Sequence, residues 1–267
     1  MIAEKILPII IILFVGLPHG AADILIAKRL FRDSYFHILF FILAYSLIAL
    51  IVGIIWLIIP TISLLLFLLI SIGHFGLMDT YKTRSLPFRY VRAGLYGFTP
   101  IIIPLVFHTN EVNLLFSLLL FSNNFEIINY ILFLFPLWII GNLVFLYKGG
   151  IETKFELLEI FLISIVLIIL PPLWGFAFYF CIIHSSRHSI NVFFTLEILS
   201  KTDWLSLILI ILATLLFIFL GAYLFSTNNF DNSLIRLTFI SLAALTIPHI
   251  VLIDFYKGLT LISKKIS

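Results

Sequence analysis

The 267-residue sequence has little charge and almost no cysteine. Only 11% of its residues are Asp, Glu, Lys or Arg, whereas 63% are hydrophobic, and its mean hydropathy is +1.23. So few charges exclude an ordinary water-soluble globular domain. The one cysteine, Cys181, excludes a disulfide framework and a metal cluster held by thiolates. The sequence therefore predicts an integral membrane protein.

Alternating polarity and processing signals are also missing. Stretches such as LPIIIILFVGL and FLISIVLIIL do not alternate apolar and polar residues, which excludes the strands of a membrane barrel. The first apolar run lacks a small-residue cleavage site and is interrupted by GLPHGAAD, so we expect a retained helix and not a signal peptide. No linker or repeat divides the chain. We expect one integral membrane domain over residues 1–267.

The sequence does contain recurring apolar runs of about twenty residues, each long enough to cross a hydrocarbon core roughly 30 Å thick as a helix. They predict an all-α fold, a polytopic transmembrane helical bundle of about nine spans. Eight or ten remain alternatives, because the fourth span is short and EVNLLFSLLLF after it is typical of a re-entrant or interfacial segment. The expected spans are residues 5–28, 36–59, 61–80, 93–107, 125–147, 155–170, 172–199, 204–226 and 234–257.

The positions of Lys and Arg support nine spans. Short cytoplasmic loops collect these residues, and nine spans leave only Lys5 and Arg236 on one side of the membrane, with Arg187 inside a span. The other thirteen are Lys28, Arg29, Arg32, Lys82, Arg84, Arg89, Arg92, Lys148, Lys154, Lys201, Lys257, Lys264 and Lys265. This predicts a multi-pass protein of the cell membrane with its N-terminus outside and its C-terminus in the cytoplasm. The net charge of +3 requires anionic lipid headgroups at most and no nucleic-acid partner.

Five of the seven histidines are expected inside the membrane. His37 and His108 fall at span ends, where an imidazole reaches water. The remaining histidines lie about seven to fifteen residues from the cytoplasmic ends of four spans: His19, His74, His184, His188 and His249. A buried polar group costs free energy unless it has a partner, and intramembrane ionisable residues usually mark function. We therefore expect one histidine layer forming a central intramembrane metal site.

His184 and His188 are four residues apart, so on an α-helix both rings project from one face and could bind one ion. Neutral imidazole suits iron, zinc, copper and nickel. Glycine and proline near these histidines would kink helices or admit close neighbours. They are Gly16, Pro18 and Gly20 near His19, Gly73 and Gly76 near His74, and Pro248 before His249.

The acidic residues near the histidines are candidate partners of the rings. Asp23 follows His19 by four residues and could accept its second ring N–H. Asp79 and Asp254 follow His74 and His249 by five residues, a less favourable offset. We expect the buried charge of Arg187 to pair with Asp23 or Asp79.

Four segments, GLPHGAADIL, SIGHFGLMD, CIIHSSRHS and IPHIVLID, resemble in order and spacing the motifs of the Brp/Blh family of bacterial and archaeal membrane proteins. Those proteins are β-carotene 15,15′-dioxygenases, which use O2 to cut the central double bond and release two molecules of all-trans-retinal. The resemblance implies a non-haem Fe(II) held by His19, His74, His184 and His188. It implies a role for His249 as a fifth ligand, a partner of the ligands or a wall of the pocket. Cys181 departs from the aromatic residue common near this motif, which affects the shape of the pocket and the choice of carotenoid.

Other functions remain open at this point. A membrane di-iron desaturase or hydroxylase also uses HxxxH, but it needs about eight histidines with HxxHH boxes, and this chain has seven and no HxxHH. A transporter or proton relay would also place His, Asp and Arg at membrane depth. Two histidines could bind haem, and an accessory role in opsin biogenesis is a further alternative. The oligomeric state also stays open.

Overall fold

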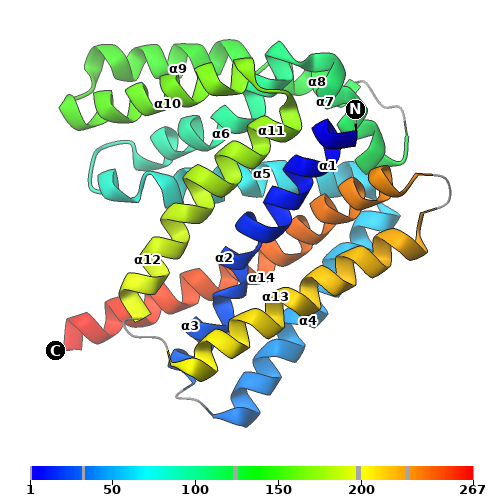
Figure 1. Ribbon diagram of the computed structural model, residues 1–267. Coiled ribbons are helices and arrows are strands. Elements are labelled where there is room, and N and C mark those ends of the chain that lie inside the picture. The colour runs from blue at the N-terminus through cyan, green and yellow to red at the C-terminus, as the bar shows by residue number, and fades with distance from the viewer. Residues whose placement is uncertain (1, 32–33, 123–125, 197–199, 227–228, 267) are drawn as a thin grey trace. The chain divides into compact units, whose positions relative to one another are not determined.

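The computed structural model describes residues 2–31, 34–122, 126–196, 200–226 and 229–266 (Figure 1). Within these ranges every regular element is a helix, which confirms the predicted all-α class. The chain divides into two compact units. The first unit comprises residues 3–8 and Pro60–Arg187, and the second comprises Ile9–Ile59 and His188–Ser267.

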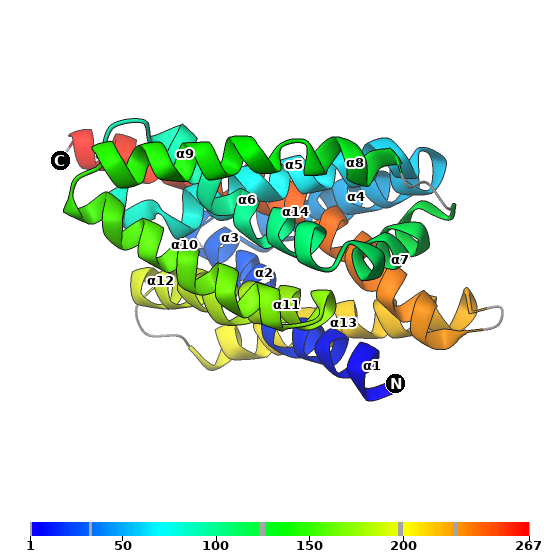
Figure 2. The same cartoon turned by 90° about the horizontal axis from the view of Figure 1, so that it is seen from above.

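In the first unit, α5 packs along α6, and α6 packs against α9 and α10, which run side by side (Figure 1). Figure 2 shows that α8 and α9 continue one another in direction. The elements are α5 (Pro60–Asp79), η2 (Tyr81–Thr83), α6 (Arg89–Phe107), α7 (Thr109–Leu120), α8 (Glu126–Leu132), α9 (Phe135–Lys148), α10 (Ile151–Ile169), α11 (Pro172–Ala177) and η3 (Phe178–Ser185). The expected re-entrant or interfacial piece is α7, whose 12 residues extend only about 18 Å.

Two glycines allow α5 and α6 to cross in backbone contact. A Cβ added to Gly76 would lie 1.8 Å from the carbonyl oxygen of Ala93, and one added to Gly97 would lie 2.0 Å from that of Ile72. Small residues permit such close approach between membrane helices. The crossing lies two residues beyond His74 and so fixes the helix that carries this histidine. Gly73, by contrast, faces open space.

A buried arginine fixes the loop that follows α5. The guanidinium of Arg92 donates to Glu156 at 2.5 Å, and to the carbonyl oxygens of Thr83 at 2.8 Å and Pro87 at 3.1 Å. The Thr83 hydroxyl also donates to Glu156. Because the ion pair is buried and its remaining hydrogen-bonding capacity is used, it ties this loop to α6 and α10.

In the second unit, α4 and α13 both pack on α14 (Figures 1 and 2). Its 24-residue helix α4 buries only Trp56, as expected for a helix that faces lipid. The boundary between the units falls within α1 (Ile2–Ile11), after Pro8. The further elements are η1 (Ile12–Gly16), α2 (Pro18–Ala21), α3 (Asp23–Leu30), α4 (Tyr35–Ile58), α12 (Ser186–Leu196), α13 (Lys201–Leu224) and α14 (Phe230–Ile266).

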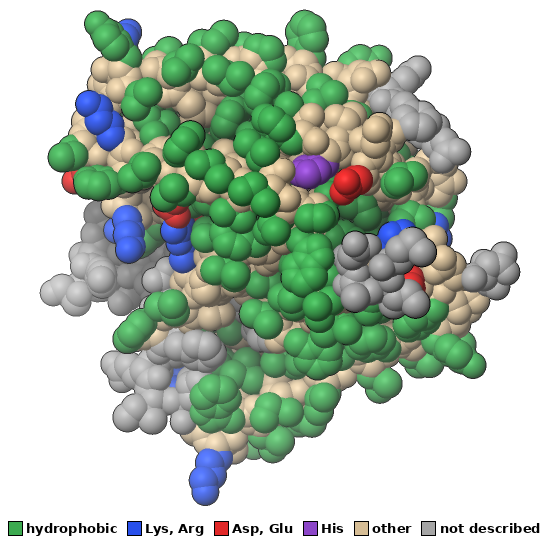
Figure 3. Space-filling model, turned by 45° about the horizontal axis from the view of Figure 1, so that its top comes forward, with side chains coloured by type: hydrophobic (Ala, Val, Ile, Leu, Met, Phe, Trp, Pro, Cys, Tyr) green, Lys and Arg blue, Asp and Glu red, His purple; other side chains and the backbone are tan. Residues whose placement is uncertain are grey.

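Six helical segments in the described part of the chain are long and apolar enough to cross a membrane. They are Tyr35–Ile58, Pro60–Asp79, Arg89–Phe107, Ile127–Lys148, Lys201–Leu224 and Phe230–Leu252. Large hydrophobic side chains dominate the face shown in Figure 3, with few charges among them. Such a surface suits lipid and not water. The protein is therefore a membrane protein.

Three of the nine expected spans differ from simple apolar helices. Helix α10 carries four charged residues in its first nine positions. Residues 5–28 and the described part of the other span, 172–196, instead consist of shorter helical pieces, which include the π-helix η1 in the first segment and η3 in the second. In η1 the Leu17 N–H donates to the Ile12 carbonyl at 2.9 Å, just before Pro18, which has no N–H. Both π-helices adjoin or contain a histidine motif, and π-turns are frequent at functional sites.

Candidate metal centre

The first unit holds a histidine pair oriented by an aspartate. His74 of α5 and His184 of η3 meet edge to face, with ring centroids 4.9 Å apart and planes at 68°. Nδ1 of His184 lies 3.3 and 3.4 Å from the two carboxylate oxygens of Asp79, the last residue of α5. The hydroxyl of Tyr179 donates to the same carboxylate at 2.8 Å. Tyr179, Asp79 and His184 therefore form one connected and buried group.

The second unit holds the same arrangement, built from other helices. The rings of His188 on α12 and His249 on α14 meet edge to face, 5.0 Å apart at 80°. Nδ1 of His249 lies 2.9 Å from both carboxylate oxygens of Asp23 on α3. The hydroxyl of Tyr45 on α4 donates to Asp23 at 2.9 Å. Asp23, His188 and His249 are all buried, and their candidate ligand atoms lie within 4.8 Å of one another.

This arrangement determines which ring nitrogens can bind a metal. A neutral imidazole that donates its Nδ1–H to a carboxylate presents Nε2 as a lone-pair donor, and the carboxylate raises the basicity of that nitrogen. The Nε2 atoms of His184, His188 and His249 are all buried. Neutral imidazole donors suit iron, zinc or copper. The residues present thus fit a divalent transition metal.

The carboxylates have histidine partners that helix spacing did not predict. Asp79 contacts His184 where His74 was expected, and Asp23 contacts His249. The spacing argument considered partners on the same helix, whereas each carboxylate here reaches a histidine on another helix. The side chains of His19 and Asp254 lie outside the described residues, so their expected roles stay predictions.

The expected partner of Arg187 was wrong as well. Its guanidinium pairs with Glu159 on α10 and donates to the Tyr96 hydroxyl at 3.0 Å. It reaches Asp79 only at the backbone carbonyl oxygen, at 3.4 Å. Glu159 lies early in α10, among charges that the sequence pattern places near a span end, so it was not considered.

The two histidines expected at span ends lie there. His37 is exposed in the first turn of α4 and hydrogen-bonds Ser34 at 2.8 Å. His108 follows α6, and its Nε2 contacts the Ile168 carbonyl oxygen at 3.0 Å. Nδ1 of His108 lies 4.0 Å from the exposed carboxylate of Glu111, farther than His184 and His249 lie from their buried aspartates.

Sequence reasoning missed Tyr45 and Tyr179. Tyr179 precedes His184 by five residues, which is one turn of a π-helix, where hydrogen bonds join residues five apart. The spacing of Tyr179 from His184 could have indicated a shared site. It is a signal only once the segment is recognised as a π-helix. Tyr45 gives no local signal, because its aspartate lies on another helix.

Aromatic rings surround His184. Phe75 lies 4.6 Å from it at 59°, and Phe180 stacks on it at 6.1 Å and 17°. Phe176 stacks in turn on Phe180, 5.4 Å away at 6°. These rings make an apolar wall beside a polar group, as small-molecule sites commonly have.

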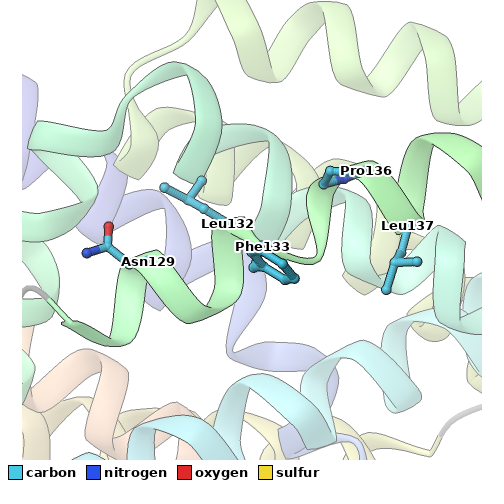
Figure 4. Close-up of a pocket in the computed structure, with 5 residues that line it drawn as sticks. All are labelled: Asn129, Leu132, Phe133, Pro136 and Leu137. Atoms are coloured by element: carbon cyan, nitrogen blue, oxygen red, sulfur yellow. The ribbon is translucent and has the colours of Figure 1, made fainter.

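A surface pocket at the break between α8 and α9 is a poorer candidate site. Its lining residues are Asn129, Leu132, Phe133, Pro136 and Leu137 (Figure 4). All come from one short stretch of chain, and none is a histidine or an acid. The pocket lining therefore offers no imidazole or carboxylate donor for a metal.

Comparison with known proteins agrees with the motifs. Residues 10–257 match the family model described as Beta-carotene 15,15'-dioxygenase. The chain is 35% identical over 258 residues to the Beta-carotene 15,15'-dioxygenase of an uncultured marine bacterium, 66A03, covering 92% of this chain and 91% of that relative. No solved structure matches. The resemblance seen in the four motifs is thus confirmed, and the chain belongs to the β-carotene 15,15′-dioxygenase family of enzymes.

Proposed function

We propose that this protein cleaves β-carotene at its central 15,15′ double bond with O2, in an iron-dependent reaction that yields two molecules of all-trans-retinal. One double bond breaks and each of its carbons becomes an aldehyde, so one carotene and one O2 account for both products. The observation that carries the proposal is the recurrence, in each unit, of a histidine pair with one buried ring oriented by aspartate. Family membership supplies the substrate class.

The proposed ligands of Fe(II) are His19, His74, His184 and His188, with His249 as a fifth ligand or a partner of the ligands. When bound, non-haem iron supplies the open coordination positions at which O2 is activated beside an alkene. Asp79 holds Nδ1 of His184 and Asp23 holds Nδ1 of His249. Each carboxylate thereby keeps one ring proton on the side away from Nε2.

The apolar wall of Phe75, Phe176 and Phe180 suits a hydrocarbon substrate. A C40 polyene partitions into the bilayer, so we propose that it enters sideways between helices and packs against such rings. Aromatic side chains next to His184 also exclude water from that side of the ring. Dry surroundings protect reactive oxygen chemistry from side reactions.

We further propose one integral membrane domain over residues 1–267 with about nine spans and a central metal site. In this arrangement α10 and the two π-containing segments cross the membrane together with the six long apolar helices. The N-terminus lies outside and the C-terminus in the cytoplasm of a cell-membrane protein. The two π-helical segments would then carry their histidine motifs within the bilayer.

The test is metal analysis and product analysis of the full-length protein purified in detergent. We expect about one iron per chain, conversion of β-carotene to retinal, and loss of cleavage on chelation that Fe(II) restores and Zn(II) does not, because zinc has no redox chemistry. Each of His19→Ala, His74→Ala, His184→Ala and His188→Ala should lose bound iron. Cleavage by metal-free protein would overturn the proposal, and two irons per chain would favour a di-iron oxygenase.

A further inference from the structure

Each carboxylate that holds a histidine is itself held by a tyrosine. The Tyr179 hydroxyl donates to Asp79 at 2.8 Å, and the Tyr45 hydroxyl donates to Asp23 at 2.9 Å. We propose that Tyr179 and Tyr45 are positioning residues, which set the iron affinity of the centre by orienting His184 and His249 through these aspartates. The inference rests on the proposed function, since it presumes that the histidines bind iron.

In the first unit, packing alone does not decide whether Nε2 of His184 faces the metal, because turning the ring by 180° about its Cβ–Cγ bond exchanges Nε2 with Cε1 and Nδ1 with Cδ2. Phe75 and Phe180 contact the ring, but a ring turned by 180° has the same shape and would fit them equally well. The hydrogen bond between Nδ1 and Asp79 distinguishes the two orientations. The tautomer therefore depends on where the Asp79 carboxylate points.

The carboxylate of Asp79 needs a second anchor to keep that direction. Its contacts to Nδ1 are long, at 3.3 and 3.4 Å, whereas the Tyr179 hydroxyl approaches to 2.8 Å. A hydroxyl that donates to a carboxylate makes a charge-assisted bond, stronger than one between neutral groups. Tyr179 is fully buried and packs against Phe75 at 5.3 Å, so it is held firmly in place. It is thus the shortest and most rigid contact that Asp79 makes to another side chain among the described residues.

In the second unit, Tyr45 also connects the helices that build the group. Its hydroxyl reaches Asp23 on α3 and lies 3.2 Å from the carbonyl oxygen of Leu245 on α14. Leu245 precedes His249 by four residues, which is one helical turn. Tyr45 of α4 therefore links the carboxylate to the turn that leads into its histidine.

The recurrence of the same order of contacts argues against a merely local role. A buried phenol can satisfy its hydroxyl on any backbone carbonyl, yet both tyrosines donate to the aspartate that orients a histidine. The two groups use different helices, η3 and α5 in one unit and α3, α4 and α14 in the other. Orientation of a metal-binding ring is the purpose that both share.

The experiment measures iron affinity and iron release to a chelator for Tyr179→Phe and Tyr45→Phe in the full-length, iron-loaded protein. Phenylalanine keeps the ring and removes only the hydroxyl. Loss of a group that orients a metal ligand typically weakens binding by about 10- to 100-fold, and we expect the lower end for these variants because each aspartate remains. Tyr147→Phe and Tyr223→Phe are matched controls at exposed positions, 89% and 70% accessible, and should bind iron as the parent does.

A double-mutant comparison separates orientation from a general loss of structure. If Tyr179 acts through Asp79, then adding Tyr179→Phe to Asp79→Asn should weaken iron binding by less than it does in the parent. When Tyr179→Phe is added to Asp23→Asn instead, it should weaken iron binding as much as it does in the parent, because Tyr179 makes no hydrogen bond to Asp23. If Tyr179→Phe does not fold, Tyr45→Phe replaces it in the comparison. Its effect should then shrink in the Asp23→Asn background and remain in full in the Asp79→Asn background.

Parent-like iron affinity in the tyrosine variants, or full additivity within one Tyr–Asp pair, would overturn the inference. These results differ from a failure of the proposed function. If the proposed function fails, the parent itself holds no iron. If only this inference fails, the parent still holds iron and cleaves β-carotene.

Discussion

Nδ1 of His249 lies 2.9 Å from both carboxylate oxygens of Asp23, although 226 residues separate them in the sequence. The contact joins α3 to α14 within the second unit. It also gives His249 the same environment that Asp79 gives His184 in the first unit. An aspartate thus orients the ring of His249 as another orients the ring of His184.

Replacing His249 should impair the metal centre. We expect His249→Gln to lower iron affinity by about 10- to 100-fold, whether the ring is a fifth ligand or orients one. Metal analysis after dialysis against a graded chelator measures this. His37→Gln is the control, because the His37 ring is exposed and contacts Ser34. Equal iron retention in the two variants would remove His249 from the site.

The glycine crossing of α5 and α6 should tolerate no side chain. Gly76→Ala would push a methyl group into the Ala93 backbone, and overpacking of this kind typically costs about 1–3 kcal/mol. We expect a lower unfolding temperature in detergent and a loss of iron, since His74 lies two residues away. Gly73→Ala is the matched control on the same helix, where the added methyl meets nothing within 4 Å. A similar melting shift in both variants would contradict the crossing.

The buried ion pair of Arg92 and the partly exposed ion pair of Arg187 should contribute differently to stability and to cleavage. Arg92→Leu leaves Glu156 buried without its cation, a change that typically costs about 3–5 kcal/mol. The ion pair of Arg187 with Glu159 is about one-third exposed, so Arg187→Leu should lower stability by about 1 kcal/mol or less. Arg187→Leu should nevertheless reduce cleavage, because it removes a contact to the backbone of Asp79. Thermal unfolding and turnover, measured on the same preparations, would show this split, and equal unfolding temperatures would refute it.

The proposed orientation can be tested with introduced cysteines. Native Cys181 is buried, so the parent should not react with a membrane-impermeant thiol reagent in intact cells. Asn229→Cys, before α14 on the proposed outer side, should be labelled in intact cells. Lys82→Cys, in the exposed turn after α5, should be labelled only after lysis. The reverse pattern would invert the orientation.

Length and hydropathy were sufficient to predict the fold class and most helices. The expected span 61–80 corresponds to α5, Pro60–Asp79, because Pro60 begins the helix and polar residues follow its end. Residues 5–28 and 172–199 were harder. Where almost every side chain is apolar, the hydrophobic pattern has no period that would distinguish an α-helix from a π-helix.

The site was predictable in its histidines but not in their partners. A histidine inside an apolar run is conspicuous by itself, so His184 and His249 were found without knowledge of the fold. Their carboxylates come from other helices, and the sequence spacing of Asp79 from His74 contains no information about a contact with His184. Tyr45 was missed for the same reason, since it lies on α4 and its partner Asp23 lies on α3.

In the π-helix η3, the number of residues between Phe178 and Ser185 affects the shape of the helix more than the identity of each residue does. A π-turn accommodates one residue more than an α-turn, so deleting one residue here could restore ordinary α-helical hydrogen bonding without shortening the chain's reach greatly. It would also change the spacing between Phe176 and Phe180 or between Phe180 and His184, and so disrupt one of these two ring stacks. Relatives with a one-residue gap at this place should therefore present a different wall to the substrate while retaining every histidine.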